Sequence, residues 1–363
     1  MFNILNQGVV CPKIAWEVKP MQAGYPLKEL FVEVTNSCLL YCRHCSSEAS
    51  AANNEYIPAR QLYKLVDEGI PLGLERLTVS GGEPLQYDEL FQVLEYAGLR
   101  GIKLAVYSCG VIKDDEGNLA PISEKIVKQL SASGTAKVIF SIHGESSGTH
   151  EYITRVTGSF ALTLESIKRV LSAGLPVELH FVPMSVNVHE IPGVLALASS
   201  LGISQVSLLR LVQQGRCRDN ADDLMLTGKQ AVGVVKQVRH LRKWFSKISI
   251  RIGAPFNCVT EGETTLCSAS QNKLLISASG EVFPCEAFKF LKGSRRKIYD
   301  FPLKELWYND DLLSYLRNLH LQDIAVCSEC SIQEKCRGGC PGERMLFNKD
   351  IATGPEPWCR LNI

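Results

Sequence analysis

The sequence lacks the features that mark a membrane protein or a protein held to nucleic acid by charge. No apolar run approaches the roughly 18 residues that a spanning helix requires, and no basic segment followed by an apolar core begins the chain, so no signal peptide is expected. The 363 residues include 39 basic and 38 acidic side chains, a formal net charge of +1. This balance argues against a nucleic-acid or acidic-membrane partner. We expect a cytoplasmic protein and a monomer.

Cysteine, by contrast, is abundant and unevenly placed. The chain has 14 cysteines, and a reducing cytosol favours metal binding or catalysis over disulfides. Three of them lie together in the stretch NSCLLYCRHCSS, at Cys38, Cys42 and Cys45. Cys11 and Cys217 are expected to be spectator thiols. Eight others lie in the last third of the chain: Cys258, Cys267, Cys285, Cys327, Cys330, Cys336, Cys340 and Cys359.

Strand-like and helical segments alternate from Glu29 onward. Between the β-rich runs, segments such as ELFQVLEYAGLRG carry apolar residues at helical spacing and end in glycine. This order predicts an α/β fold with a parallel sheet, either a partial (β/α)6 barrel or an open doubly wound sheet. The six predicted strands are 30–35, 76–80, 103–108, 137–142, 177–183 and 205–212.

The texture of the sequence also suggests domain boundaries. A polar, glycine-containing stretch follows the sixth strand, and a basic helix and a short strand come next. Beyond them, turn signals and cysteines predominate, as in a small Cys-rich α+β domain. We predict an N-terminal extension (1–28), a core (29–225), a linker helix and strand (226–257) and a cysteine-rich domain (258–363).

The informative loops follow the predicted strands. Ligands of parallel α/β folds bind at the carboxyl ends of the strands, where NSCLLYC follows the first strand and GGEP (81–84) the second. Three thiolates can bind three irons of a [4Fe-4S] cube and leave the fourth iron open for a ligand. A zinc ion or cluster completed by a distant ligand, or a set of buried thiols, is the alternative. The two glycines allow a close backbone approach, and the Glu83 carboxylate suits an ammonium group.

Together these residues resemble the radical S-adenosylmethionine (radical SAM) enzymes. Cys38, Cys42 and Cys45 match the cluster motif of that family, and Gly81, Gly82, Glu83 and Pro84 match its GGE motif. The resemblance implies that the open iron is chelated by the amino and carboxylate groups of S-adenosylmethionine. It also implies reductive cleavage to a 5′-deoxyadenosyl radical that abstracts a hydrogen atom from the substrate.

Further residues are carried over from the same resemblance. Ser141 resembles the ribose-contacting position, and Arg155 resembles the arginine that pairs with the methionine carboxylate, a bidentate task suited to guanidinium. A turn residue and a solvated charge are the respective alternatives. His44 and Cys109 depart from the common family pattern, and Cys109 puts one polar contact near the cofactor in doubt. His143 is expected to be a structural, hydrogen-bonded histidine.

The cysteine spacing of the tail resembles the SPASM extension of radical SAM peptide-modifying enzymes. A zinc ribbon is the alternative for the C-x2-C element. The resemblance implies two auxiliary [4Fe-4S] clusters, and therefore three clusters in all. The inner cluster would be bound by Cys258, Cys267, Cys285 and Cys340, with Cys258 the least certain because it lies outside the core pattern. The outer cluster would be bound by Cys327, Cys330, Cys336 and Cys359.

Glu286, directly after Cys285, sits where some relatives carry an aspartate base. A carboxylate beside a partly buried cluster could have a raised pKa and act as a general base. A surface charge or a salt bridge is the alternative reading.

The predicted function is that of a radical SAM/SPASM oxidoreductase that crosslinks or oxidises a side chain of a peptide or small protein, as in the maturation of peptide natural products. A separate peptide-recognition protein is a possible partner, and a flavodoxin- or ferredoxin-type protein is the expected one-electron reductant. One alternative is a radical SAM dehydrogenase or epimerase of a small molecule, such as an amino sugar or a tetrapyrrole side chain. An iron-sulfur electron carrier without catalysis is a third possibility, but it gives no reason for the three-cysteine loop followed by GGEP.

Overall fold

One large sheet dominates the structure. The computed structural model describes residues 24–260 and 265–359, and within them a nine-stranded sheet has the order β11-β10-β1-β2-β3-β6-β7-β8-β9. A separate hairpin pairs β4 (Val111–Lys113) with β5 (Leu119–Pro121). The strands of the large sheet are β1 (Glu29–Thr35), β2 (Arg76–Gly81), β3 (Lys103–Ser108), β6 (Thr135–Ser141), β7 (Val177–Phe181), β8 (Gln205–Leu208), β9 (Ser249–Ile252), β10 (Lys273–Ile276) and β11 (Val282–Phe283).

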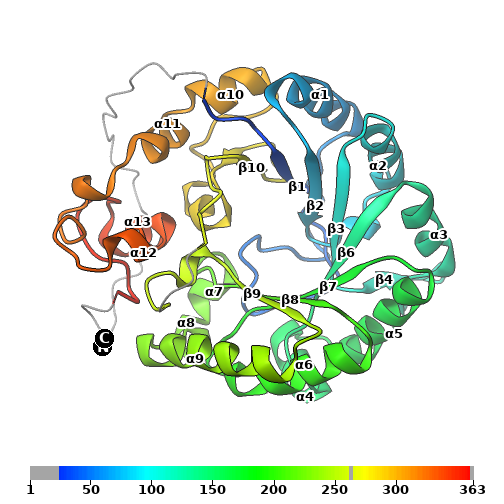
Figure 1. Cartoon of the computed structure of the whole chain (residues 1–363). Coiled ribbons are helices and arrows are strands. Elements are labelled where there is room, and N and C mark those ends of the chain that lie inside the picture. Colours follow the sequence, from blue (N-terminus) through cyan, green and yellow to red (C-terminus); the bar gives the residue numbers. More distant parts are fainter. Residues whose placement is uncertain (1–23, 261–264, 360–363) are drawn as a thin grey trace.

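The six predicted strands are confirmed, and they run parallel in chain order from β1 to β8. The sheet curves while helices cover its outer side (Figure 1). The strand order does not close, because β9 and β10 are separate neighbours of β8 and β1 rather than of each other. The prediction of an α/β fold with a partial barrel is therefore confirmed. Because all six strands are parallel, their carboxyl ends lie at one edge of the sheet.

The helices form where the sequence supplies apolar faces and caps. In α3 the Ser123 hydroxyl accepts from the Ile126 amide, and Thr227 and Gln230 form a capping box that starts α9. The helices are α1 (Ala59–Gly69), α2 (Leu90–Gly98), α3 (Glu124–Ala132), α4 (Ser147–Thr154), α5 (Ser159–Ser172), α6 (Ile191–Ser200), α7 (Arg216–Asp219), α8 (Ala221–Leu224), α9 (Gly228–Trp244), α10 (Leu303–Asn309), α11 (Asp311–Asn318), α12 (Gln333–Cys336) and α13 (Pro341–Asn348).

The alternation of β1 shows how the sheet separates its two faces. Leu30, Val32 and Val34 are fully buried in the main hydrophobic core, which they share with the surrounding helices. Because successive side chains point to opposite faces, Phe31 and Glu33 point to the inner face. This inner face therefore carries charged and aromatic side chains beneath the strand ends.

Part of the predicted cysteine-rich domain belongs to the same sheet. β10 pairs in parallel with β1, and β11 pairs antiparallel with β10. The helices α10 to α13 (orange to red) lie beyond that edge of the sheet (Figure 1). The predicted boundary at residue 258 stays a prediction, and most of the predicted extension 1–28, with Cys11, lies outside the described residues. Among the described helices, none has the length and apolar character needed to cross a membrane.

Candidate iron-sulfur and cofactor site

The three-cysteine loop follows β1 and is held by backbone hydrogen bonds to the end of α4. The Tyr41 amide donates to Thr154 O (3.1 Å) and the Arg43 amide donates to Ile153 O (2.9 Å). Burial raises the pKa of the Cys42 thiol well above its usual range, and the nearby thiolates of Cys38 and Cys45 raise it further. Bound metal reverses this effect, because a coordinating thiol is deprotonated. Cys38 and Cys45 therefore lie close enough to Cys42 to oppose its ionisation, and three such thiols fit the donor set of a cluster.

Arg216 supports this loop, and the sequence reasoning did not single it out. Its amide donates to Cys45 O (3.1 Å), and its Nε donates to Cys42 O (2.9 Å). Its guanidinium lies 4.0 Å from the centre of the Tyr41 ring. Burial raises the pKa of the Cys45 thiol, and the positive charge of Arg216 opposes this rise. In the sequence, Arg216 lies in the basic stretch GRCR (215–218) after the sixth predicted strand. The sequence reasoning considered only Cys217 in that stretch.

The GGEP loop lies directly against the cysteine loop. The Gly82 amide donates to Thr35 O (2.7 Å), and the Glu83 amide donates to Ser37 O (2.8 Å). A Cβ atom at Gly82 would stand 2.0 Å from Ser37 O, and one at Gly81, whose φ is 124°, would stand 2.2 Å from Thr35 O. Neither position accommodates a side chain without displacing backbone. The glycines are thus required for the contact between the two loops.

The Glu83 carboxylate is fully buried and bonded within the protein. It accepts from Ser108 Oγ (3.0 Å), the Cys109 amide (2.8 Å) and the Leu85 amide (3.1 Å). Burial raises its pKa, and hydrogen bonds led by those of Cys109 oppose the rise. The Cys109 side chain also hydrogen-bonds Cys38 and so lowers the pKa of that thiol. In the structure Glu83 ties together the loops after β2 and β3, and its contact with S-adenosylmethionine stays a prediction.

The other predicted cofactor contacts are spread around these loops. Pro84 is buried at the start of a 3-10 turn (Pro84–Gln86). Ser141 ends β6, half-buried, in register with His180 of β7. Arg155 is exposed in the left-handed position that ends α4 (φ 61°), and its Nη2 donates to Asn220 Oδ1 (3.4 Å). Among the described residues, no hydrogen bond or ion pair joins Arg155 to Ser141 or Glu83, and their shared contact with S-adenosylmethionine stays a prediction.

Substitution of Gly82 by alanine should separate the two loops. Because the new Cβ would meet Ser37 O at 2.0 Å, we expect Gly82→Ala to lose a large part of the iron bound after anaerobic reconstitution. Gly101→Ala is the control, since Gly101 lies just before β3 and has open space around its Cβ position at φ 75°. That control should lose about 1 kcal/mol of stability and no iron. Equal iron contents in the two variants would contradict the expectation.

Two buried histidines, His143 and His150, and the half-buried His44 lie beside the loop. The rings of His44 and His143 are 4.6 Å apart, and those of His143 and His150 are 5.2 Å apart. Burial lowers the pKa of His44 to about 4 and that of His150 to about 4, so both are neutral at pH 7. Ligand atoms of Cys42, His44 and His143 lie within 4.8 Å of one another. The His143 amide donates to His150 Nδ1 (3.3 Å), and the His143 carbonyl oxygen accepts from Asn187 Nδ2 (3.0 Å).

The tail cysteines fall into groups that largely follow the predicted sets. Burial raises the pKa of Cys285, and so do the thiolates of Cys267 and Cys340. In the other set, burial raises the pKa of Cys336 to about 11, and the thiolates of Cys327 and Cys359 add to this rise. Burial also raises the pKa of Cys327, and the thiolate of Cys330 adds to that rise.

Cys258 is buried near Arg210, and so is the predicted inner ligand Cys340. Cys258 is 1% exposed, and burial raises its pKa. The cysteine that adds to this rise is Cys336, which was predicted for the outer cluster. Its assignment to the inner cluster, like both auxiliary clusters, stays a prediction.

Glu286 begins the turn Glu286–Leu291, on which Lys289 points back to the cysteine loop. Burial would raise the Glu286 pKa, but the ion pair with Lys273 (3.4 Å) lowers it below its usual range. The expectation of a raised Glu286 pKa is therefore wrong, because Lys273, the first residue of β10, lies beside the Glu286 carboxylate. A role for Glu286 as a base stays a prediction.

The inner face of the sheet holds a hydrogen-bonded pair that the sequence reasoning missed. Glu178 and His180 lie two residues apart on β7, and the His180 Nε2 is 3.1 Å from Glu178 Oε1. Glu178 also accepts from Ser207 Oγ (2.6 Å) and Lys137 Nζ (2.7 Å). These partners outweigh burial and lower the Glu178 pKa. His180 lies in register with Ser141, so this pair is one strand away from a predicted cofactor contact.

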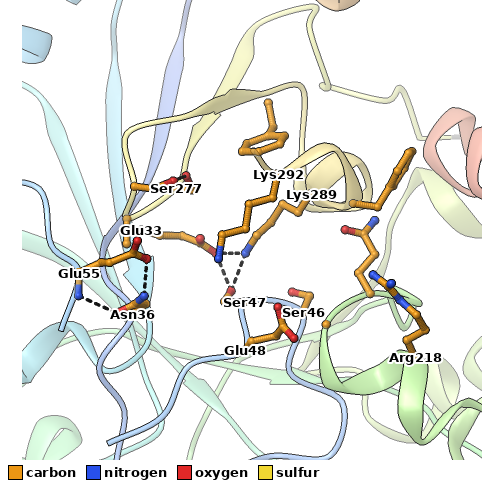
Figure 2. A pocket seen from close by; sticks show the side chains of 16 residues that line it. Glu33, Asn36, Ser46, Ser47, Glu48, Glu55, Arg218, Ser277, Lys289 and Lys292 are labelled. Carbon is orange, nitrogen blue, oxygen red and sulfur yellow. Dashed lines mark hydrogen bonds and ion pairs between the residues drawn. The ribbon is translucent and has the colours of Figure 1, made fainter. Parts of the chain in front are cut away.

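A pocket of about 120 Å³ opens at the strand ends between the cysteine loop and the tail (Figure 2). On one wall, Lys289 Nζ donates to Glu33 Oε1 (2.6 Å) and to Ser47 Oγ (2.7 Å). Beside it, Asn36 Nδ2 donates to Glu55 Oε2 (2.6 Å). Charged side chains of both signs line the pocket: Glu33, Glu48, Glu55, Arg218, Lys289 and Lys292.

The fold and these loops define a class of protein, an open parallel α/β barrel that presents three clustered thiols at its strand ends. Residues 32–198 match the Radical SAM superfamily. The chain therefore contains a radical SAM domain, and the resemblance expected from the sequence is confirmed. The family implies a [4Fe-4S] cluster and S-adenosylmethionine, and the three thiols of the loop fit that cluster.

The matches to similar proteins cover most of the chain. The AdoMet-dependent heme synthase of Methanosarcina barkeri is 25% identical over 353 residues, which cover 90% of this chain and 94% of that protein. The mycofactocin maturase MftC of Mycolicibacterium smegmatis is 25% identical over 343 residues, which cover 90% of this chain and 81% of that one. The crystal structure of Streptococcus suis SuiB bound to precursor peptide SuiA has a TM-score of 0.76 at 17% identity, and the match covers 93% of this chain and 76% of SuiB. This last similarity establishes a shared fold.

Proposed function

We propose that this radical SAM protein is a SPASM-type oxidoreductase that crosslinks or oxidises a side chain of a peptide or small protein. Cys38, Cys42 and Cys45 would hold the [4Fe-4S] cluster, and Gly81–Pro84, Ser141 and Arg155 would hold S-adenosylmethionine. When bound, these groups would supply the 5′-deoxyadenosyl radical that removes a hydrogen atom from the substrate. A precursor peptide bound to SuiB and the maturase name of MftC support a peptide substrate.

The pocket at the strand ends is the observation that carries this proposal. Its walls come from the cysteine loop (Ser46–Glu48), from the loop before α7, and from the turn that follows Cys285. The pocket therefore lies between the cysteine loop and the turn that follows Cys285. Its volume of about 120 Å³ is well below the roughly 300–1,000 Å³ typical of pockets that enclose whole small molecules. It suits one side chain of a longer substrate, whose remaining residues would lie outside.

The chain's own residues would close and orient this site. The buried pair of Lys289 and Glu33 joins the tail to β1, and Arg216 fixes two carbonyls of the cysteine loop. The eight tail cysteines would hold two auxiliary clusters, one of which could take the electron that leaves an oxidised substrate. The protein would act in the cytoplasm, receive its first electron from a separate reductant, and bind its peptide directly or through a recognition protein.

A tetrapyrrole side chain is a second candidate substrate. The similarity to the AdoMet-dependent heme synthase of Methanosarcina barkeri, which covers 94% of that protein, favours a tetrapyrrole substrate. The mixed charges and small volume of the pocket argue against a planar macrocycle, which would need a larger apolar cleft.

The proposed activity is tested by anaerobic reconstitution followed by dithionite and S-adenosylmethionine. We expect about twelve irons per chain, since three cubes hold four irons each, and release of 5′-deoxyadenosine. A total of about four irons would remove the auxiliary clusters from the proposal. Absence of 5′-deoxyadenosine would overturn the enzymatic function.

The substrate class is tested by mass spectrometry after turnover. Short peptides encoded beside the gene and a tetrapyrrole with carboxylate side chains are incubated in parallel with the reconstituted protein. We expect a peptide to lose a pair of hydrogen atoms and the tetrapyrrole to remain unchanged. Oxidation of the tetrapyrrole alone would replace the peptide proposal with the second candidate.

A further inference from the structure

The outer side of the three-cysteine loop carries a compact patch of arginine and tyrosine. We call Tyr41, Arg43 and Tyr152 the loop-face patch, and Arg155, the proposed cofactor contact, borders it. The Arg43 guanidinium lies 4.3 Å from the centre of the Tyr152 ring, and the Arg155 guanidinium lies 5.6 Å from that of Tyr41. Both tyrosines remain open to solvent, with 46% of Tyr41 and 42% of Tyr152 exposed. The rings and guanidinium groups thus alternate over the loop that bears Cys38, Cys42 and Cys45.

The positive charges of this patch and of Arg155 have neutral partners within the described ranges 24–260 and 265–359. Arg43 Nε donates to Tyr152 O (3.0 Å), and its Nη1 donates to Asn220 Oδ1 (3.3 Å). Arg155 Nη2 donates to the same Asn220 oxygen (3.4 Å). The carboxylates of Asp219, Asp222 and Asp223 are exposed on α7 and α8, and none forms an ion pair with these arginines in that part of the chain. Two guanidinium groups therefore share one amide oxygen at the surface.

Such a patch is suited to an acidic protein partner. Arginine and tyrosine are enriched at protein interfaces, where they supply contact area and charge at a small entropic cost. Complementary charge mainly raises the rate of encounter and selects the partner. The position of the patch further limits the kind of partner, because a protein bound there would lie next to the cysteine loop. Arg43 is adjacent to Cys42 in the chain, and consecutive Cα atoms are about 3.8 Å apart.

We propose that the loop-face patch docks an acidic one-electron carrier protein that reduces the cluster site. The inference rests on the proposed function, because reductive cleavage of S-adenosylmethionine needs one electron from outside. That electron would leave the reduced cofactor of the carrier and enter the site held by the three cysteines, and no atom would be transferred. Docking here gives the electron a short path through the loop itself. Entry at the tail cysteines would need a longer path along the chain.

The test compares two reductants on the reconstituted full-length protein. 5′-Deoxyadenosine formation is measured with flavodoxin, its reductase and NADPH in one series, and with dithionite in the other. Arg43→Gln and Tyr152→Ala are the patch variants. Arg60→Gln, on the exposed side of α1, is the matched control. Iron content is determined for every variant, so that loss of the cluster is recognised separately.

We expect each patch variant to lower the flavodoxin-driven rate by about fivefold to tenfold at low salt, because the removed groups steer and hold the partner. The dithionite-driven rate of each patch variant should stay within about twofold of the rate of the unsubstituted protein, since a small reductant needs no docking surface. Added salt should slow the flavodoxin-driven rate of the unchanged protein more than that of Arg43→Gln. Arg60→Gln should behave like the unchanged protein in both series.

Other results would overturn the inference. Equal losses with both reductants would assign the patch to cluster integrity, and unchanged flavodoxin rates would place the docking site elsewhere, such as the tail. An unchanged protein that reacts with dithionite but not with flavodoxin would also refute this partner. The proposed function fails separately, if the unchanged protein forms no 5′-deoxyadenosine with dithionite.

Discussion

Cys42→Ala will remove about four irons per chain from the reconstituted protein, the content of one cube, and will lower 5′-deoxyadenosine formation by about a thousandfold or more. The Cys42 thiol is held between Cys38 and Cys45, and burial together with these neighbours raises its pKa well above its usual range. Without metal, this arrangement stabilises only the protonated thiol. The proposed function assigns this thiol to iron as a thiolate, and alanine would leave the iron without that ligand.

The control for this result is another buried cysteine. Cys217 is fully buried against Leu211 and Leu224, and burial raises its pKa to about 12. Cys217→Ala should cost about 1 kcal/mol of stability through a small cavity and should keep its full iron content and rate. Iron content by colorimetric assay and 5′-deoxyadenosine by liquid chromatography measure both effects. A full iron complement in Cys42→Ala would show that the loop does not hold a cluster.

Arg210→Ala will destabilise the folded protein by about 3–5 kcal/mol, the range found when one partner of a buried ion pair is removed. Arg210 lies at the end of β8 and pairs with Glu356, while its Nη2 is 3.8 Å from Glu343 Oε2. The side chains of all three residues are at most 3% exposed. Burial would lower the pKa of Arg210, but the two carboxylates raise it above its usual value. Alanine would remove a counter-charge that both buried carboxylates share.

Removal of the Arg210 side chain should also disturb the segment that carries the last tail cysteine. The Arg210 guanidinium lies 3.7 Å from the centre of the Trp358 ring, next to Cys359, so its removal should loosen the segment that holds a predicted ligand of the outer cluster. Urea unfolding and iron content measure the two effects. Lys28→Ala is the control, because the pair of Lys28 and Glu75 is 48% and 61% exposed and contributes at most about 1 kcal/mol. Similar shifts of the unfolding midpoint in both variants would contradict this account.

Much of the fold follows from local patterns. Each predicted strand is a short β-rich run, and helical patterns between them end in glycine. The six parallel strands β1, β2, β3, β6, β7 and β8 could therefore be placed from the sequence. The Cys-x3-Cys-x2-Cys loop and GGEP were also found this way, since each lies within a few residues directly after a strand. Local spacing predicts such elements because neighbours in the chain must be neighbours in space.

The partners of these elements could not be predicted in the same way. Arg216 reaches the carbonyl of Cys42 from 174 residues away, and Lys289 reaches Glu33 from 256 residues away. Nothing in the local sequence of either residue specifies its partner. The direction of the Glu286 pKa shift was wrong for the same reason, because it depends on Lys273 of another strand.

By itself, the sequence determined the parallel α/β fold, the three clustered thiols and the loop that lies beside them. Only the tertiary structure decided that β10 of the tail joins the sheet next to β1, that the Glu83 carboxylate is bonded within the protein, and that Cys258 lies near Cys336. The physical reason is range. Periodicity and spacing act over a few residues, whereas burial, charge pairing and pKa depend on segments that meet only when the whole chain has folded.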